Sequence, residues 1–143
     1  MIRCLTISWP ILQVKRNEDT LGIPAPFYGF HWSRKKYQTM AAFKHPENSV
    51  FLSSMTSWEI GIKFHLGKLV LPAAPDIFIP IERKGHKIAS LKLAEKDTFH
   101  LANLPAVHKD PFDRILVCQA IENGLTILTS DQHIQRYPVK TLW

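Results

Sequence analysis

From residue 49 onwards, short apolar runs alternate with longer segments in which apolar residues recur at helical spacing. The short runs predict buried strands, and the longer segments predict amphipathic helices. The predicted strands cover residues 50–53, 88–91, 125–129 and 139–143. The predicted helices cover residues 54–66, 76–84, 94–104 and 110–123, with a helical turn at 131–136. This alternation indicates an α/β protein whose small parallel sheet is covered by helices on both faces.

The periodicity also predicts which helix residues face the core and where the helices end. In the helix predicted over 54–66, the following apolar residues share one face: Met55, Trp58, Ile62 and Leu66. In the helix predicted over 94–104, we expect Phe99 and Leu101 to point to the core. Glycines directly follow two of the helices, at Gly67 and Gly124, where they are typical helix terminators.

The first 48 residues follow no comparable pattern. Residues 1–9 are compatible with a strand and residues 33–44 with a helix, but glycines and prolines interrupt the segment between them. We therefore treat the 143 residues as one domain with an atypical segment at 1–48 and a regular part at 49–143. A shifted reading frame would also produce such an abrupt change.

Composition and charge narrow the function classes. The hydrophobic content of 45% is that of a globular protein, and no apolar run is long enough to cross a bilayer. We expect no signal peptide, and the two cysteines show no metal-binding spacing, so a reducing, cytoplasmic setting fits best. The net charge of +6 is compatible with a polyanionic partner. Aromatic residues are not interspersed with basic ones along the chain in a way that predicts base stacking.

Acidic residues follow two of the predicted strands and begin the helix at 110–123. Glu59 lies beyond the strand at 50–53, Asp131 follows the strand at 125–129, and Asp113 lies beside Asp110 and Pro111. Because the carboxyl ends of parallel strands share one edge of a sheet, we expect these acids to converge there. A structural alternative is equally available: Asp110 caps its helix, Asp113 meets the helix dipole, and Thr56 with Glu59 matches a capping box.

Converging carboxylates are typical ligands of Mg²⁺ or Mn²⁺, which share their sites with phosphate groups. Two cationic side chains, Lys63 and Arg114, are candidate phosphate or carboxylate partners. His108 is a weaker candidate for substrate contact. Thr129 and Ser130 are candidates for binding an acid or a metal-bound water, with capping of the next turn as the alternative.

Four ordered segments in residues 49–143 resemble the PIN domain, and in particular the VapC-like toxins of bacterial toxin–antitoxin pairs. They contain Ser53-Ser54, Ser57-Trp58-Glu59-Ile60 and Ile62-Lys63; Gly67-Lys68-Leu69 and Leu71-Pro72; Leu104-Pro105 and His108-Lys109-Asp110-Pro111-Phe112-Asp113-Arg114; and Leu128-Thr129-Ser130-Asp131. The resemblance implies a three-layer α/β/α sandwich, Mg²⁺- or Mn²⁺-dependent cleavage of RNA, neutralisation by a cognate antitoxin and a homodimer. It assigns the family's acidic residues to Glu59, Asp113 and Asp131, with Asp110 as an accompanying acid.

The chain departs from this family at its amino terminus. Family members begin with a strand that ends in an Asp-Thr-His-like segment, and that first Asp is a principal metal ligand. Residues 1–9 contain no acid, and Asp19 is a weak candidate to replace it. The alternative function is therefore a degenerate PIN-like protein that retains antitoxin binding or dimerisation but does not cleave. A metal-free RNA-binding module is a third hypothesis.

Overall fold

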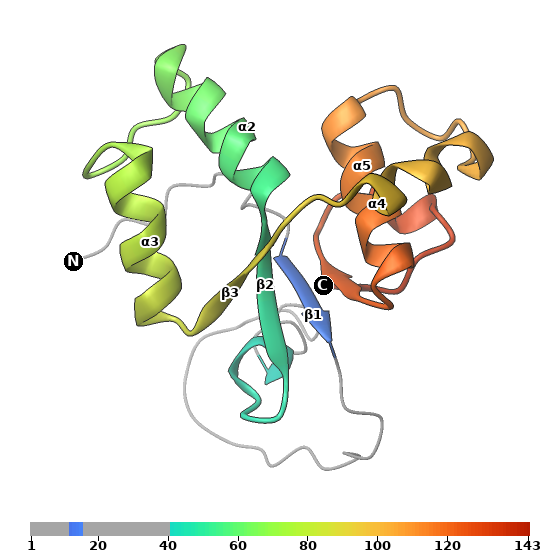
Figure 1. Cartoon of the computed structure of the whole chain (residues 1–143), viewed down its shortest axis with the longest axis horizontal. Coiled ribbons are helices and arrows are strands. Elements are labelled where there is room, and N and C mark those ends of the chain that lie inside the picture. Colours follow the sequence, from blue (N-terminus) through green and yellow to red (C-terminus); the bar gives the residue numbers. More distant parts are fainter. Residues whose placement is uncertain (1–11, 16–40) are drawn as a thin grey trace.

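The computed structural model describes residues 12–15 and 41–143. The strands are β1 (Leu12–Lys15), β2 (Ser49–Ser53), β3 (Ile88–Leu91), β4 (Thr126–Leu128) and β5 (Thr141–Leu142). The α-helices that lie wholly within the described residues are α2 (Ser54–His65), α3 (Pro75–Gly85), α4 (Glu95–Phe99) and α5 (Pro111–Glu122). Two 3₁₀ helices follow α4 and β4: η1 (His100–Asn103) and η2 (Ile134–Arg136). In the view of Figure 1, α2 and α3 lie on one side of the central strands, and α4 and α5 lie on the other.

The strands form one sheet in the order β3-β2-β1-β4-β5. β2 pairs with β3 and β4 pairs with β5 in parallel, whereas β1 runs antiparallel to both β2 and β4. The α/β class predicted from sequence is therefore confirmed, but the prediction of a wholly parallel sheet is wrong because β1 reverses direction. Residues 12–15 lie in the part of the chain whose sequence shows no regular pattern, and they form a strand by pairing with β2 and β4.

The pairing register fixes which strand ends meet. Leu12, at the start of β1, is paired with Leu52 and Leu128 near the ends of β2 and β4. Lys15, at the end of β1, is paired with Ser49 at the start of β2. The carboxyl ends of β2, β3, β4 and β5 therefore share one edge of the sheet, and the carboxyl end of β1 lies at the opposite edge.

Local sequence signals explain where α2 and α5 begin. Ser53 is the N-cap of α2, with its hydroxyl accepting a hydrogen bond from the Met55 amide at 3.1 Å. The capping box predicted for Thr56 and Glu59 is wrong, because the helix starts at Ser54 and both residues lie inside it. Asp110 caps α5 as predicted, accepting from the Phe112 amide at 2.8 Å.

Glycines end both helices as the sequence predicts. Gly67 and Gly124 have φ angles of 67° and 61°, a left-handed conformation that glycine adopts without steric cost. After Gly124, the Leu125 amide donates back to the Ala120 carbonyl at 2.8 Å, which completes a Schellman motif. The two predicted helix ends are thus confirmed.

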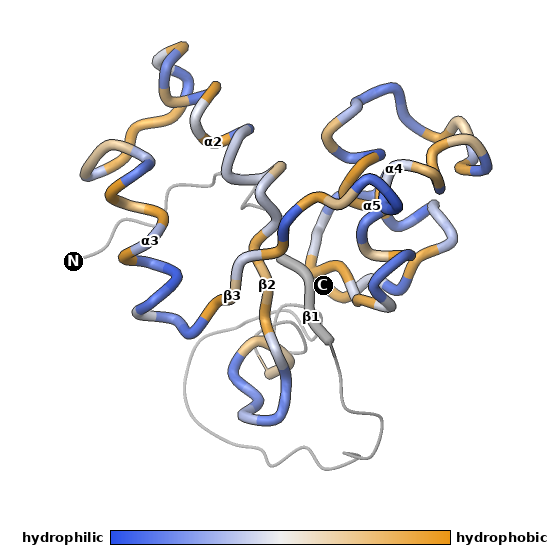
Figure 2. The backbone as a smooth tube through the Cα atoms, in the orientation of Figure 1, coloured by the Kyte–Doolittle hydropathy of each residue, from blue (hydrophilic) through white to orange (hydrophobic). Residues whose placement is uncertain are grey.

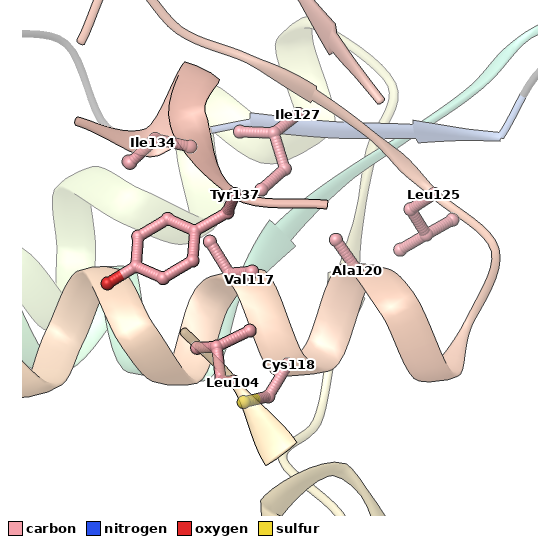
Figure 3. Packing of buried hydrophobic residues seen from close by; sticks show 8 residues of the cluster. All are labelled: Leu104, Val117, Cys118, Ala120, Leu125, Ile127, Ile134 and Tyr137. Atoms are coloured by element: carbon pink, nitrogen blue, oxygen red, sulfur yellow. The ribbon is translucent and has the colours of Figure 1, made fainter. Parts of the chain in front are cut away.

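The main core forms around α5. Its buried members come from α5, β4, η2 and the segments beside them: Leu104, Val117, Cys118, Ala120, Leu125, Ile127, Ile134 and Tyr137. Figure 3 shows Val117 and Ala120 pointing from α5 toward the side on which Ile127 and Tyr137 lie. Cys118 is buried, and burial raises the pKa of its thiol, which keeps it protonated and unreactive. Figure 2 shows apolar residues along β2 and polar residues in the turn before it.

Several residues predicted to face the core are exposed instead. Trp58 of α2 and Leu66, which directly follows that helix, are each 58% exposed, and the buried residue of α2 is Thr56. Phe99 is 65% exposed, and Leu101 is also exposed. The predicted helix 94–104 is a short α-helix that ends at Phe99, followed by a 3₁₀ helix, whose different angular period moves Leu101 away from the expected face.

Within the described residues, no helix has the length and apolar character needed to cross a membrane.

Candidate functional site

Three carboxylates, those of Asp110, Asp131 and Glu59, act on a fourth, that of Asp113, near the edge where β2 and β4 end. Asp113 lies in the first turn of α5 and is half-buried, while Asp110 is exposed at the N-cap. The pKa of Asp113 is raised to about 6, chiefly because burial removes water from its carboxyl and then because the charges of Asp110, Asp131 and Glu59 repel its ionised form. The acids predicted to converge therefore lie close enough to interact electrostatically.

An aromatic contact places α2 beside the start of α5 independently of the charges. Trp58 precedes Glu59, and Phe112 precedes Asp113. The ring centroids of Trp58 and Phe112 are 5.2 Å apart, with their planes at 52°. The start of α5 therefore packs against α2, the helix that carries Glu59.

His108 connects Asp113 with the turn after β4. Its Nδ1 atom lies 3.1 Å from Asp113 Oδ2, a contact that becomes an ion pair when the imidazole is protonated. The His108 ring stacks on His133, with centroids 4.7 Å apart and planes at 19°. The His133 amide in turn donates to Asp131 Oδ1 at 2.7 Å. Protonated His108 attracts the Asp113 carboxylate and partly offsets the repulsion from the neighbouring acids.

Tyr137 holds the backbone of His108 in place. Its hydroxyl accepts a hydrogen bond from the His108 amide at 3.0 Å and donates one to the His108 carbonyl at 3.2 Å. Neither Tyr137 nor the stacking of His133 could be predicted from sequence, because both lie in a polar turn that contains no recognisable motif. The buried Tyr137 is thus a supporting residue of the site that only the tertiary structure identifies.

The two candidate cationic side chains, Lys63 and Arg114, each contact a protein group near the acids. Lys63 Nζ lies 2.6 Å from Glu59 Oε1, one turn along α2. Arg114 donates from Nη1 to the Pro105 carbonyl at 3.1 Å, which anchors the guanidinium to the loop before α5. An exposed helical ion pair such as Lys63–Glu59 adds little stability and exchanges readily for another partner.

The residues after β4 adopt the capping role that the sequence left as an alternative. The buried Thr129 hydroxyl accepts from the Asp131 amide at 3.0 Å, and Ser130 beside it is exposed. Asp131 itself accepts from His133, so its second oxygen remains the freer one for a ligand. Asp19, the weak candidate for the family's first acid, lies outside the described residues.

The donor set suits a hard divalent cation in its chemistry, although it is not a closed metal cage. Among residues 12–15 and 41–143, no group of His, Cys, Asp or Glu is arranged to hold a metal ion with several side chains at once. Mg²⁺ commonly uses one or two carboxylates and completes its shell with water and phosphate oxygens. The crowded Asp113 carboxylate, whose ionised form is destabilised by its acidic neighbours, fits that mode of binding.

A cluster of basic side chains lies away from the acids. Arg83, Lys84 and Lys87 line a hollow of about 420 Å³ at the end of α3 and the start of β3. Ile88, the first residue of β3, pairs with Val50 near the start of β2, so this hollow is at the sheet edge opposite the acids. It is not part of the acidic site.

Comparison with protein-family models, with curated proteins and with solved structures finds no match to this chain.

Proposed function

We propose that this protein is a divalent-metal-dependent endoribonuclease of the PIN type, the toxin of a toxin–antitoxin pair. Glu59, Asp113 and Asp131 are its metal-binding acids, with Asp110 at the rim of the site. Bound Mg²⁺ or Mn²⁺ would supply a nucleophilic hydroxide and stabilise the charge that develops on the phosphodiester. The proposed arrangement of the helices and the sheet is the three-layer α/β/α sandwich of that family.

The observation that carries this proposal is the position of the Asp113 carboxylate, which is half-buried and lies near the charges of Asp110, Asp131 and Glu59. A half-buried carboxylate surrounded by like charges is costly to keep ionised, and its pKa is raised to about 6 for that reason. A purely capping role would not require Asp113 to lie near Glu59 and Asp131. A divalent cation bound between the carboxylates would attract each of them and offset the free-energy cost of ionising Asp113.

The residues around the acids then have separate roles. His108 and Tyr137 position the Asp113 carboxylate, because the tyrosine hydroxyl fixes the backbone from which the imidazole reaches it. Lys63 lies at the acidic edge as a cation that can transfer from Glu59 to a substrate phosphate. Thr129 shapes the turn that presents Asp131, and the exposed Ser130 is available to a substrate oxygen.

Calorimetric titration with Mn²⁺ tests the metal site without a choice of RNA. The unaltered chain should bind Mn²⁺, and Asp113→Asn should lose that binding and all metal-dependent RNA cleavage while remaining folded. Asp76→Asn is the matched control, since Asp76 is an exposed acid in the first turn of α3. Equal Mn²⁺ binding and RNA cleavage by the Asp113→Asn variant would refute the proposal.

A second candidate function is the degenerate PIN-like protein, and the direction of β1 favours it. In a parallel sheet, the first strand would bring its carboxyl end, with the family's first acid, to the edge where Glu59 and Asp131 lie. Here Lys15 at the carboxyl end of β1 pairs with Ser49 at the other edge. Absence of Mn²⁺ binding in both the unaltered chain and Asp113→Asn would support this second function.

The proposed partners are a cognate antitoxin and a second copy of the chain. The support is a set of exposed apolar side chains on α2, α3 and the loop between them: Phe64, Leu66, Val70, Ile77 and Ile81. Ile77 and Ile81 are one helical turn apart and share a face of α3. Light scattering should report a dimer for the unaltered chain and a monomer for Ile81→Lys, if this face mediates dimerisation.

A further inference from the structure

A groove lies next to the acidic residues, between α2, η1 and the start of α5. Its volume is about 450 Å³. The residues of its lining that matter here are Met55, Trp58, Leu101, Phe112, Lys109 and Arg114. They come from three separate parts of the chain, so the sequence did not predict the groove. Aromatic and basic residues meet in this groove although they are not interspersed along the chain.

Trp58 is the main aromatic surface of this groove. Its side chain is 58% exposed, an unusual state for the largest apolar residue type. Phe112 contacts it with ring centroids 5.2 Å apart and supports it from α5. An aromatic ring that is held in place and open to solvent can stack with a planar ligand at a small cost in conformational entropy.

The charged groups of the groove are cations. Among the described residues that line it, Lys109 and Arg114 carry charge and none is acidic. The hydrogen bond from Arg114 to the Pro105 carbonyl fixes one cation, and the exposed Lys109 provides a mobile one. This combination of aromatic surface and cationic rim complements a nucleotide, which has a flat base and an anionic phosphate.

The chain also connects the groove directly to the proposed catalytic acids. Trp58 directly precedes Glu59 in the sequence, and Phe112 directly precedes Asp113. We propose that the groove is a base-stacking subsite for single-stranded RNA, in which a base stacks on Trp58 while the adjoining backbone passes Lys109 and Arg114 to the acids. This inference rests on the proposed ribonuclease function and adds the side chains that hold a base of the substrate; a base inside a duplex cannot reach the ring.

The test compares two probes in the presence of a chelator, so that neither metal nor cleavage contributes. One probe is a short fluorescein-labelled oligoadenylate, and the other has the same backbone with abasic nucleotides. Fluorescence anisotropy should give an affinity for the oligoadenylate on the order of tenfold higher, as expected when stacking on an aromatic side chain contributes to binding. Trp58→Ala should abolish the difference, and Trp58→Phe should retain most of it.

Phe99→Ala is the matched control, because Phe99 is an aromatic residue at the end of α4 that is 65% exposed and is not among the residues that line the groove. The control should keep the preference for the probe that carries bases. Lys109→Ala should lower the affinity for both probes to the same extent, since the proposed lysine contact is with the backbone that the two probes share. If Trp58→Ala does not fold, the two probes on the unaltered chain and on Trp58→Phe still decide the question.

Equal affinity of the unaltered chain for both probes, or absence of binding to either, would overturn the subsite. A preference that survives Trp58→Ala would overturn it as well. If Trp58→Ala instead converts a dimer to a monomer and leaves the preference for bases unchanged, the groove is an interface for a second copy and the proposal is wrong. If the unaltered chain does not bind Mn²⁺ or does not cleave RNA, the ribonuclease function is refuted, but the affinities for the two probes, which are measured with a chelator, do not change.

Discussion

Asp113→Asn should make the protein more stable at neutral pH while it removes the proposed activity. The pKa of Asp113 is raised from 3.8 to about 6 by burial and by its acidic neighbours, so the folded state is penalised when the carboxyl ionises. A shift of roughly two pKa units corresponds to an upper bound of about 3 kcal/mol. The carboxyl is only half-buried, and solvent screening reduces the expected gain to about 1–2 kcal/mol.

The pH dependence follows from the direction of the shift. Below pH 3.8 the carboxyl is protonated in both the folded and unfolded states, so Asp113 imposes no penalty there. Between pH 3.8 and about 6 the folded state holds the proton more tightly, and stability falls as pH rises. Above about pH 6 the full penalty is present. The Asp113→Asn variant cannot ionise and should lack this loss.

Urea denaturation of the two proteins across this pH range measures the effect. At pH 7.5 the variant should have the higher free energy of unfolding and a melting temperature higher by roughly 5 °C. The difference should vanish near pH 3.5. Asp76→Asn should not reproduce the gain, since Asp76 is exposed in another helix. Parallel pH profiles for Asp113→Asn and the unaltered chain, or a loss of stability at pH 7.5, would refute the electrostatic reasoning.

Three further substitutions test the supporting structure. Tyr137→Phe removes the hydroxyl that bonds both backbone groups of His108 and should lower the free energy of unfolding by about 1–3 kcal/mol in urea titrations; an unchanged value would argue against this role. Ile127→Ala leaves a cavity at a fully buried position in β4 and should cost about 2–5 kcal/mol by the same measurement. Glu122→Gln weakens the contact between Glu122 Oε2 and His100 Nε2, which are 2.7 Å apart. Hydrogen bonds to His100 and then to Lys96 lower the pKa of Glu122, so its carboxylate stabilises the fold when it is ionised. The variant should therefore be less stable than the unaltered chain at pH 7, and this difference should shrink as the pH falls below 4.5.

The raised pKa of Asp113 and the proposed metal site are two expressions of one arrangement. Groups placed for a bound ligand are often costly to the free protein, which is why mutations at functional sites can stabilise the fold. Added Mn²⁺ should therefore stabilise the unaltered chain and leave the melting temperature of Asp113→Asn unchanged. This comparison separates a functional cluster of acids from one that only caps a helix.

The sequence by itself determined the features that depend on neighbours in the chain. Asp110 and Pro111 predict the start of α5, and Gly124 predicts its end, because capping and left-handed turns involve residues within one or two helical turns. The α/β class follows in the same way from the alternation of strand and helix patterns. The expectation that acids at strand ends and helix starts share one edge of the sheet predicted that Asp113 and Asp131 would interact.

The tertiary structure decided everything that depends on partners distant in the sequence. The antiparallel direction of β1 comes from pairing with β2 and β4, which residues 12–15 do not specify alone. The periodicity of α2 identifies an apolar face, but whether Trp58 is covered depends on which elements pack there, and it is left exposed in the groove. His133 and Tyr137 reach the site only because the chain folds back after β4 and the rings then meet His108. Sequence patterns predict the geometry of neighbouring residues. Whether a side chain is buried, and whether it belongs to the site, depends on contacts between segments that are far apart in the sequence.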